Sequence, residues 1–526
     1  MTIGVVGAGT MGAGIAQLGC QAGEETLLLD ADPAALERAR ERIAQGIDKA
    51  AARGRADPGA LRRLRVVPSA EELSGCEVVI EAIPEDLALK QRVFGEIAEV
   101  VGPECVLATN TSSIPVTAVA AGVERPERVV GMHFFNPAPV MKLVEVIAGV
   151  GSAEWAVERV RELGRAMGRT VIDAADGPGF LVNRCNRPFG LEGLRCLQEG
   201  LADAPAIDRI VRMGGGFRMG PFELSDLVGI DVGFEVSKSF YSLSFGEPRW
   251  RPSPLQARMA ASGRHGRKTG RGWYEYGDGP HRPDDPPPPE GGQSPSYSGD
   301  SPLNNRGTVP LVALAGHSPL AGELGGLASS AGFDVRPPDE VGGEVPWLSI
   351  DCGRDDDEPP LEGAPQLLLC DRASLAELDG DGPAAGFHAL PPLGEARLVE
   401  MTRGPYTAAA AAERGEAFFA ALGKHVAWVG DAPGLVLGRI VCQLVNEAAF
   451  ALGEGVGSAE DIDTGLVLGM NHPRGPLAWA DLIGLEHVVA VLAALRADRG
   501  DAYRIAPELR RHAALDLTFH EDTALD

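Results

Sequence analysis

The chain has 526 residues, of which 44% are hydrophobic and 23% charged, a composition typical of a folded globular protein with several domains. Its net charge of −26 argues against nucleic acid and anionic membranes as partners, because binding to either needs an excess of Lys and Arg. Its eight cysteines include no C-x-x-C pair, and the sequence has neither a secretion signal nor an apolar run of the ~20 residues that span a bilayer, so we expect a cytoplasmic protein with reduced thiols, no metal and no membrane segment.

A glycine-rich turn follows the first predicted strand. Residues 3–6 are aliphatic and lead through G-x-G-x-x-G into a helical segment, the setting in which a pyrophosphate lies against the turn and the helix N-terminus. The predicted cofactor-binding residues of this turn are Gly7, Gly9, Thr10, Met11 and Gly12. A second predicted strand ends at Asp30, about 20 residues downstream, where a carboxylate accepts hydrogen bonds from the adenosine ribose and repels a 2′-phosphate. NAD is therefore favoured over NADP, and a glycine-rich turn without a ligand is the alternative.

Strands and helices then alternate along the chain. Helices are predicted near 33–53 and 90–101. The predicted strands lie at 76–83, 105–110, 127–134 and 142–148. Apolar strands between amphipathic helices indicate a Rossmann-type parallel sheet, whose ligands bind at the carboxyl ends of the strands.

Residues 133–145 read HFFNPAPVMKLVE, with two polar side chains at the ends of an apolar stretch. A carboxylate held against a histidine ring fixes its tautomer and supports an imidazolium, so His133 and Glu145 could form a general base. The alternative is a core histidine and an unrelated surface glutamate. Asn110, Ser112 and His133 all fall at the ends of predicted strands, which favours the functional interpretation.

Four further blocks carry a resemblance to a known family. TNTSSIPV, HFFNPAPVMKLVEV, DGPGFLVNR and GPFELSDLVG follow one another after the Rossmann start, and GRKTGRGWYEY closes the region. In this order they resemble the L-3-hydroxyacyl-CoA dehydrogenase family over residues 1–278. The resemblance implies a dinucleotide-binding domain, a helical domain and the NAD-dependent oxidation of a 3-hydroxyacyl-CoA to the 3-ketoacyl-CoA.

The resemblance also implies catalytic roles. His133 would take the hydroxyl proton, Glu145 would orient it, Ser112 would hydrogen-bond the reacting oxygen, and Asn183 would hold the substrate or its developing carbonyl. Ser112 as a cap of the helix near Ile114, and Asn183 as a polar helix residue, are the alternatives.

The same resemblance assigns further binding residues. It places Asp30 on the ribose and Glu85, Lys90 and Asn110 along the NAD and nicotinamide region. Arg53 falls near the family's basic contact to the CoA part of the acyl-CoA substrate.

The second half of the chain repeats the first. Residues 280–302 contain eight prolines and no aliphatic side chain, which indicates a linker. Beyond it, a shift of 255 residues aligns 176–230 with 431–485 without a gap, giving 17 identities in 55 positions. We predict an NAD-binding Rossmann domain, a helical domain, a Pro-rich linker, a degenerate Rossmann-like domain and a second all-α helical domain. Their predicted ranges are 1–177, 178–279, 280–304, 305–430 and 431–526.

The two copies differ at the predicted site. The shift places His388 and Glu400 on His133 and Glu145, but it places Gly438 on Asn183. A nearby alignment puts Ala373 in place of Ser112, and the strand at 309–316 leads into HSPLAG instead of a glycine-rich turn. We therefore expect a second copy that binds no NAD and is inactive, with His388 and Glu400 as remnants. By analogy with shorter family members, the two helical domains would pair within the chain, and a homodimer is a further arrangement.

The acyl chain is left open by the sequence. The resemblance implies a short or medium chain, as in 3-hydroxybutyryl-CoA or 3-hydroxyadipyl-CoA, within fatty-acid β-oxidation, butyrate or phenylacetate catabolism. Two alternatives are an enzyme that oxidises a free 3-hydroxy acid and a non-catalytic protein that has kept the fold. The former commonly uses a lysine base on the helical domain, where this chain has Asn183.

Overall fold

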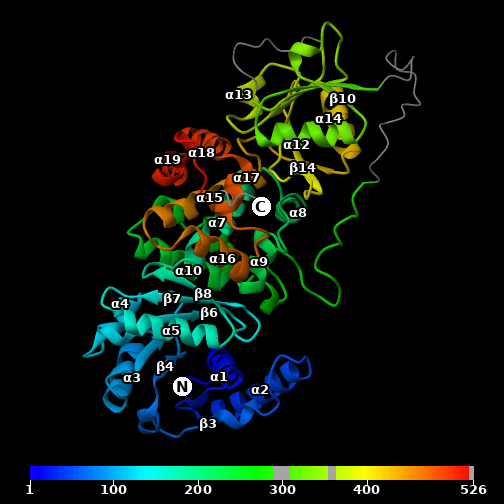
Figure 1. The fold of residues 1–526 in the computed structure, drawn as a ribbon. Coiled ribbons are helices and arrows are strands. Elements are labelled where there is room, and N and C mark those ends of the chain that lie inside the picture. The colour runs from blue at the N-terminus through cyan, green and yellow to red at the C-terminus, as the bar shows by residue number, and fades with distance from the viewer. Residues whose placement is uncertain (290–308, 354–362, 521–526) are drawn as a thin grey trace. The chain divides into compact units, whose positions relative to one another are not determined.

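The computed structural model describes residues 1–289, 309–353 and 363–520. The chain divides into two compact units. The first contains Met1–Cys185 and Ala451–Asn471, and the second contains Asn186–Phe450 and His472–Asp526. Each unit holds one sheet, drawn in blue to cyan for the first and in green to yellow for the second in Figure 1.

The first unit is built on an eight-stranded sheet in the order β3-β2-β1-β4-β5-β6-β7-β8. Its strands are β1 (Thr2–Val6), β2 (Glu25–Leu29), β3 (Leu64–Val66), β4 (Val78–Glu81), β5 (Val106–Thr109), β6 (Val129–Phe134), β7 (Leu143–Ala148) and β8 (Thr170–Ala175). All neighbours are parallel except β6 and β7, which are antiparallel. From β1 the sheet continues to β2 and β3 on one side and to β4 and β5 on the other. This change of direction opens a ligand crevice at the carboxyl ends of β1 and β4.

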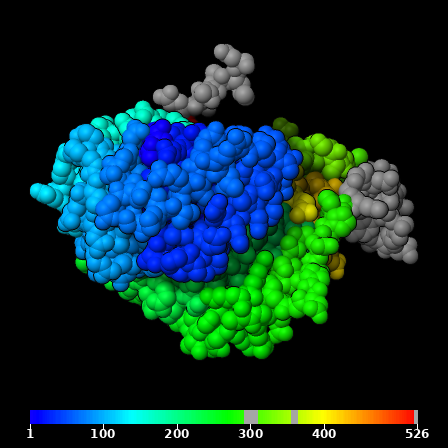
Figure 2. All heavy atoms as spheres, turned by 90° about the horizontal axis from the view of Figure 1, so that it is seen from below, coloured from blue at the N-terminus to red at the C-terminus, as the bar shows by residue number. Residues whose placement is uncertain are grey.

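Helices cover the first sheet. They are α1 (Thr10–Ala22), α2 (Pro33–Ala51), α3 (Leu87–Val100), α4 (Val116–Ala120), α5 (Glu154–Ala166) and the short α6 (Val182–Cys185). The amphipathic α2 buries Leu36, Ala39, Ile43 and Ile47, and Asp32 caps it by accepting from Ala34 N at 2.9 Å. In the space-filling view of Figure 2 the first hundred residues, in blue, form one continuous surface.

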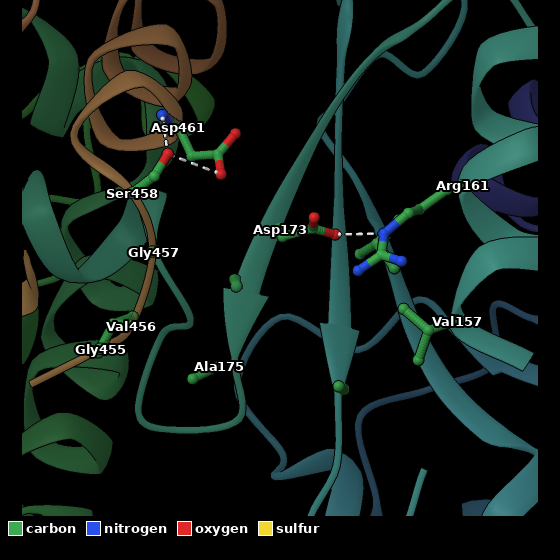
Figure 3. Close-up of a pocket in the computed structure, with 12 residues that line it drawn as sticks. Val157, Arg161, Asp173, Ala175, Gly455, Val456, Gly457, Ser458 and Asp461 are labelled. Atoms are coloured by element: carbon green, nitrogen blue, oxygen red, sulfur yellow. Dashed lines mark hydrogen bonds and ion pairs between the residues drawn. The ribbon is translucent and has the colours of Figure 1, made fainter. Parts of the chain in front are cut away.

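A segment from the far end of the chain completes the first unit. Helix α16 (Ala459–Met470) packs against β7, β8 and α6, and Ala175 N donates to Val456 O at 2.8 Å. Figure 3 shows this seam: loop 455–458 and Asp461 lie on one side of β8, while Arg161 of α5 holds Asp173 at 2.9 Å on the other. A cavity of about 310 Å³ lies along the seam.

The second unit contains helices from both halves of the chain in one core. From the first half come α7 (Arg187–Gln198), α8 (Ala204–Gly215), α9 (Pro221–Val228), α10 (Ile230–Leu243) and α11 (Pro254–Ala261). From the second half come α15 (Leu437–Gly453), α17 (Pro476–Ile483), α18 (Leu485–Arg499) and α19 (Pro507–Ala514). Buried apolar side chains from both halves form a single cluster that includes Phe189, Ile207, Val441 and Val488.

The second unit also holds a seven-stranded sheet in the order β10-β9-β11-β12-β13-β14-β15. Its strands are β9 (Leu311–Ala315), β10 (Asp334–Arg336), β11 (Leu348–Asp351), β12 (Gln366–Leu369), β13 (Ala385–His388), β14 (Leu398–Arg403) and β15 (His425–Trp428). Its helices are α12 (Pro319–Ser330), α13 (Leu375–Asp379) and α14 (Ala409–Ala421). Its topology is that of the first sheet without β3, so the predicted succession of Rossmann-like and helical parts is confirmed as a fold class.

The differences from the predicted elements have local causes. The antiparallel β6–β7 pair was expected to be parallel, but the connection from 135 to 142 is too short for the crossover that parallel neighbours need. Strands β3 and β8 were not predicted, because their sequences LRV and TVIDAA mix apolar with charged or small residues. The predicted linker lies outside the described residues from residue 290 onward. Within the described residues no single helix passes the length and hydropathy test for a membrane span, although the bent pair Pro476–Ile483 and Leu485–Arg499 does so jointly.

Candidate active site

The glycine-rich turn connects β1 to α1. Gly7 has a φ of +104°, and a Cβ there would lie 2.6 Å from Ala82 O, while a Cβ on Gly12 would lie 1.8 Å from Gly7 O. Both positions therefore require glycine for the chain's own packing. At Gly9 a Cβ would meet no atom within 4 Å, so that glycine leaves open space. Gly9 is the N-cap of α1 and has no side chain to bond the first N–H groups of the helix, which suits a pyrophosphate.

Asp30 lies beside this turn at the end of β2. Its Oδ2 accepts from Ala8 N at 2.6 Å and its Oδ1 from Asp32 N at 2.8 Å. These bonds fix a carboxylate next to the open turn, where its remaining lone pairs can accept from ribose hydroxyls. The residues present therefore fit the dinucleotide that the sequence predicts.

His133 and Glu145 face each other across β6 and β7. They are direct partners in the antiparallel register, and His133 Nδ1 lies 2.5 Å from Glu145 Oε2. The carboxylate accepts the Nδ1 proton, which leaves His133 Nε2 as a base. His133 is 5% exposed and Glu145 is fully buried, so their attraction is weakly screened. The alternative of an unrelated surface glutamate is wrong.

The second oxygen of Glu145 anchors the start of α6. Oε1 accepts from Leu181 N at 3.1 Å and from Val182 N at 2.9 Å. Asn183 is the second residue of α6, so the carboxylate that holds the histidine also fixes the backbone beside Asn183. The rings of Phe135 and Phe180 lie 4.7 and 5.9 Å from the His133 ring and keep its surroundings apolar.

Glu85 organises the turn that carries Ser112. Its Oε1 accepts from Thr111 Oγ1 at 2.6 Å, from Ser113 Oγ at 2.8 Å and from the N–H groups of Ser112 and Ser113 at 3.1 Å. Burial opposes ionisation, but these hydrogen bonds and the Lys90 charge lower the pKa of Glu85. Ser112 remains exposed after β5, in a turn that an ionised Glu85 holds in place.

Lys90 lies beneath this turn. It is 1% exposed, and its Nζ lies 2.6 Å from Glu81 Oε1 and 3.3 Å from Glu85 Oε2. This geometry favours a positioning role through Glu85, and a direct contact of Lys90 with NAD stays a prediction. Asn110 Oδ1 accepts from Phe134 N at 2.8 Å, which ties the end of β5 to β6.

Arg53 lies just beyond α2, and its side chain is exposed. Its assignment to CoA stays a prediction.

Two features of the site were missed from the sequence. Glu81 is fully buried between Lys90 and Thr109 Oγ1, and the lone carboxylate in the apolar stretch VVIEAI was the signal for it. The bonds from Leu181 and Val182 to Glu145 had no local signal.

The corresponding place in the second sheet is arranged differently. His388 and Glu400 are again register partners on β13 and β14, but Glu400 gives its two oxygens to Val436 N and Leu437 N at 2.8 and 3.0 Å. His388 Nδ1 is buried without a partner in the described part of the chain, and its Nε2 lies 3.1 Å from His487 Nε2. Burial, and secondarily His487, hold the pKa of His388 well below its usual value.

Gly438 explains this change. A Cβ on Gly438 would lie 2.2 Å from Cε1 of His388, so the histidine ring fills the space that a side chain at 438, the counterpart of Asn183, would need. The broken His–Glu bond and the missing asparagine support an inactive second copy.

Comparisons with known proteins agree with this architecture. The model of the 3-hydroxyacyl-CoA dehydrogenase NAD-binding domain matches residues 2–177, and that of the 3-hydroxyacyl-CoA dehydrogenase C-terminal domain matches both 179–276 and 434–519. The 3-hydroxyadipyl-CoA dehydrogenase of Escherichia coli K12 is 33% identical over 521 residues, 98% of each chain. A 3-hydroxybutyryl-CoA dehydrogenase of Mycobacterium tuberculosis is 39% identical over 280 residues, 52% of this chain and 98% of its own.

Solved structures give the same result. A crystal structure named as 3-hydroxybutyryl-CoA dehydrogenase of Escherichia coli K12 matches with a TM-score of 0.79 at 32% identity and covers 98% of each chain. The (S)-3-hydroxybutyryl-CoA dehydrogenase of Ralstonia eutropha matches with a TM-score of 0.51 at 37% identity, covering 53% of this chain and 99% of its own. The chain therefore belongs to the 3-hydroxyacyl-CoA dehydrogenase family and is an NAD-dependent dehydrogenase of 3-hydroxyacyl-CoA thioesters.

Proposed function

We propose that the first copy carries the active site and that His133 is its general base. The observation that carries this proposal is the bond from His133 Nδ1 to Glu145 Oε2, which leaves Nε2 free to accept the hydroxyl proton of the substrate. Glu145 then stabilises the imidazolium in an apolar setting, and Ser112 and Asn183 donate to the reacting oxygen. NAD, held by the α1 turn and Asp30, supplies the hydride acceptor when bound.

NADH oxidation with acetoacetyl-CoA tests the assignment. His133→Gln is expected to lose most of the rate, and the matched variant His388→Gln is expected to keep it. Loss of activity in His388→Gln alone would show that the active site lies in the second copy and contradict the proposal.

The acyl chain is proposed to end in a carboxylate that Arg187 binds. Arg187 begins α7 four residues after Asn183 in the sequence, and its Nε and Nη1 are buried without a hydrogen-bond partner in the described residues. Its guanidinium lies 4.9 Å from the Phe240 ring, and burial lowers its pKa to about 10. Because an unpaired buried cation costs several kcal/mol, an arrangement of this kind is expected where an anionic ligand supplies the missing partner. The name of the E. coli relative, 3-hydroxyadipyl-CoA dehydrogenase, agrees with such a substrate.

The ratio of kcat/KM for 3-hydroxyadipyl-CoA and 3-hydroxybutyryl-CoA tests this assignment. Arg187→Met is expected to lower kcat/KM at least about tenfold more for the adipyl substrate, because only that substrate has a carboxylate for Arg187 to bind. An equal loss on both substrates would show that Arg187 is structural.

The helical domains are proposed to pair within the chain as two subunits would. Reciprocal contacts support this. In the first unit Arg184 pairs with Glu454 at 2.8 Å, and in the second Arg439 pairs with Glu199 at 2.6 Å. The shift of 255 residues turns one pair into the other, as expected for a self-complementary interface.

The same reciprocity holds for two close glycine contacts. A Cβ on Gly469 would lie 3.0 Å from Leu143 and 3.1 Å from Val182, and one on Gly214 would lie 3.2 Å from Leu437 and 3.3 Å from Leu398.

A cytoplasmic location is proposed from the eight cysteines, all of which are free thiols.

A further inference from the structure

The strand register aligns the first β-α-β segment of the second sheet with that of the first. Gly4 pairs with Leu27 in the first sheet, and Ala313 pairs with Arg336 in the second. Both members of the second pair lie 309 residues after those of the first. At this shift residues 2–30 fall on 311–339 without a gap, so β1, α1 and β2 correspond to β9, α12 and β10.

Two residues of the nucleotide site are kept at this shift. Gly7 corresponds to Gly316, whose φ is +101° and where a Cβ would lie 2.7 Å from Cys352 O, so the same cramped turn follows β9. Asp30 corresponds to Asp339, which follows β10. Asp339 is exposed and accepts no hydrogen bond from the described residues, so its oxygens are open to a ligand.

A cavity lies at these two residues. Its volume is about 370 Å³, within the ~300–1,000 Å³ of small-molecule sites. The ends of β9 and β10 and the turn after β11 line it, with Leu314, Gly316 and Val335 on the walls and Asp339 at the rim. In the first domain the equivalent edge carries Asp30, the residue that we assign to the adenosine ribose.

The phosphate half of the site is lost. Gly9 is replaced by Ser318, whose Oγ accepts from Ala321 N at 3.2 Å, and Pro319 at the first helical position has no N–H. At the start of α12 one N–H group is therefore missing and another is bonded to Ser318, whereas α1 has no side-chain cap. Arg336 offers no substitute, because it is paired with Asp334 and, at 3.4 Å, with Glu344.

We propose that this cavity of the second Rossmann-like domain binds a nucleoside through its vicinal ribose hydroxyls, which donate to the Asp339 carboxylate. A dinucleotide is not the ligand, because the pyrophosphate would meet a capped helix. The second domain then contains a nucleoside site in addition to the NAD site that the first domain contains. This proposal does not depend on the activity of the first domain.

Calorimetry on the full-length chain tests the proposal. The protein is first saturated with NADH, which fills the first domain, and adenosine is then titrated. One adenosine per chain is expected. Asp339→Ala should weaken this binding at least about tenfold, since it removes the acceptor of both hydroxyls, and 2′-deoxyadenosine should bind similarly weakly. Because Asp339 is exposed, the melting temperature of the variant should equal that of the wild type.

Several outcomes would overturn the proposal. They are no adenosine binding to the NADH-saturated chain, unchanged binding in Asp339→Ala, equal binding of 2′-deoxyadenosine, or two NADH per chain. Asp30→Ala provides the matched control, because it should abolish NADH binding in the first domain while one adenosine per chain is still bound.

Discussion

Replacing Glu145 with glutamine tests the orientation of the base without removing the side chain. The amide has one acceptor and one donor end, whereas Glu145 uses an acceptor at both: Oε1 for Leu181 N and Val182 N, and Oε2 for His133 Nδ1. The two backbone N–H groups will hold the amide oxygen, because in the opposite orientation the amide N–H group would face these two N–H donors in a fully buried place. The amide nitrogen then donates to Nδ1, so the histidine proton moves to Nε2 and the base is blocked.

The expected magnitude follows from that tautomer. General base catalysis contributes about 10²–10⁴-fold, so kcat for Glu145→Gln should fall by about that factor, or about 3–5 kcal/mol. The assay is NADH formation from NAD and 3-hydroxybutyryl-CoA, the direction in which His133 acts as the base, with Glu400→Gln, at the same register position of the second sheet, as the control. Retention of kcat within about threefold by a folded Glu145→Gln, against the ~10²-fold minimum, would refute the proposed role of Glu145.

Three further predictions concern stability and assembly. Arg439→Met should lower the free energy of unfolding in urea by about 3–5 kcal/mol, because it removes a buried guanidinium that pairs with both Glu192 and Glu199, whereas Arg38→Met at an exposed pair should cost under about 1 kcal/mol. Burial lowers the pKa of His472 to about 3, so the unfolded state binds the proton first and stability falls as the pH drops below ~6.5. Urea unfolding at pH 7.5 and pH 5 should show a loss about 2 kcal/mol larger for the wild type than for His472→Gln, and an equal loss would contradict the buried neutral ring. Residues 1–280 alone lack α16 but keep its counterpart α8, so light scattering should show a homodimer, and a soluble active monomer would argue against the proposed pairing.

The sequence could predict those parts of the site that local backbone geometry determines. Gly7 and Gly12 are required by a turn and by the close approach of a helix, so their spacing is visible along the chain. The His133–Glu145 pair was predictable from strand ends and twelve residues of separation, although its antiparallel register was not. The acceptor bonds from Leu181 and Val182, 36 and 37 residues beyond Glu145, depend on packing that no local pattern encodes.

Long-range assembly was the other part that sequence patterns could not give. The repeat at 255 residues predicted two helical domains, but it could not predict that α16 packs on the first sheet. Helix periodicity identifies an apolar face and not the surface that covers it. The small residues Gly465 and Gly469, which let α16 approach Val182, become interpretable only once that contact is seen.

The two copies show how an active site of this kind can close while its fold persists. In the second copy the backbone N–H groups of Val436 and Leu437 donate to the buried Glu400, so this side chain still anchors the helix although it does not bond the histidine. With glycine at 438, the His388 ring occupies the space that a side chain there would need, and its Nδ1 has no partner among the described residues. Restoring asparagine at 438 alone would therefore meet the ring at 2.2 Å. A working second site would need the histidine to turn back, Glu400 to share one oxygen between both backbone donors, and an uncapped helix after β9. These requirements lie on different elements, whereas the fold depends on the apolar core that the helical domains share, and this core does not need any of them.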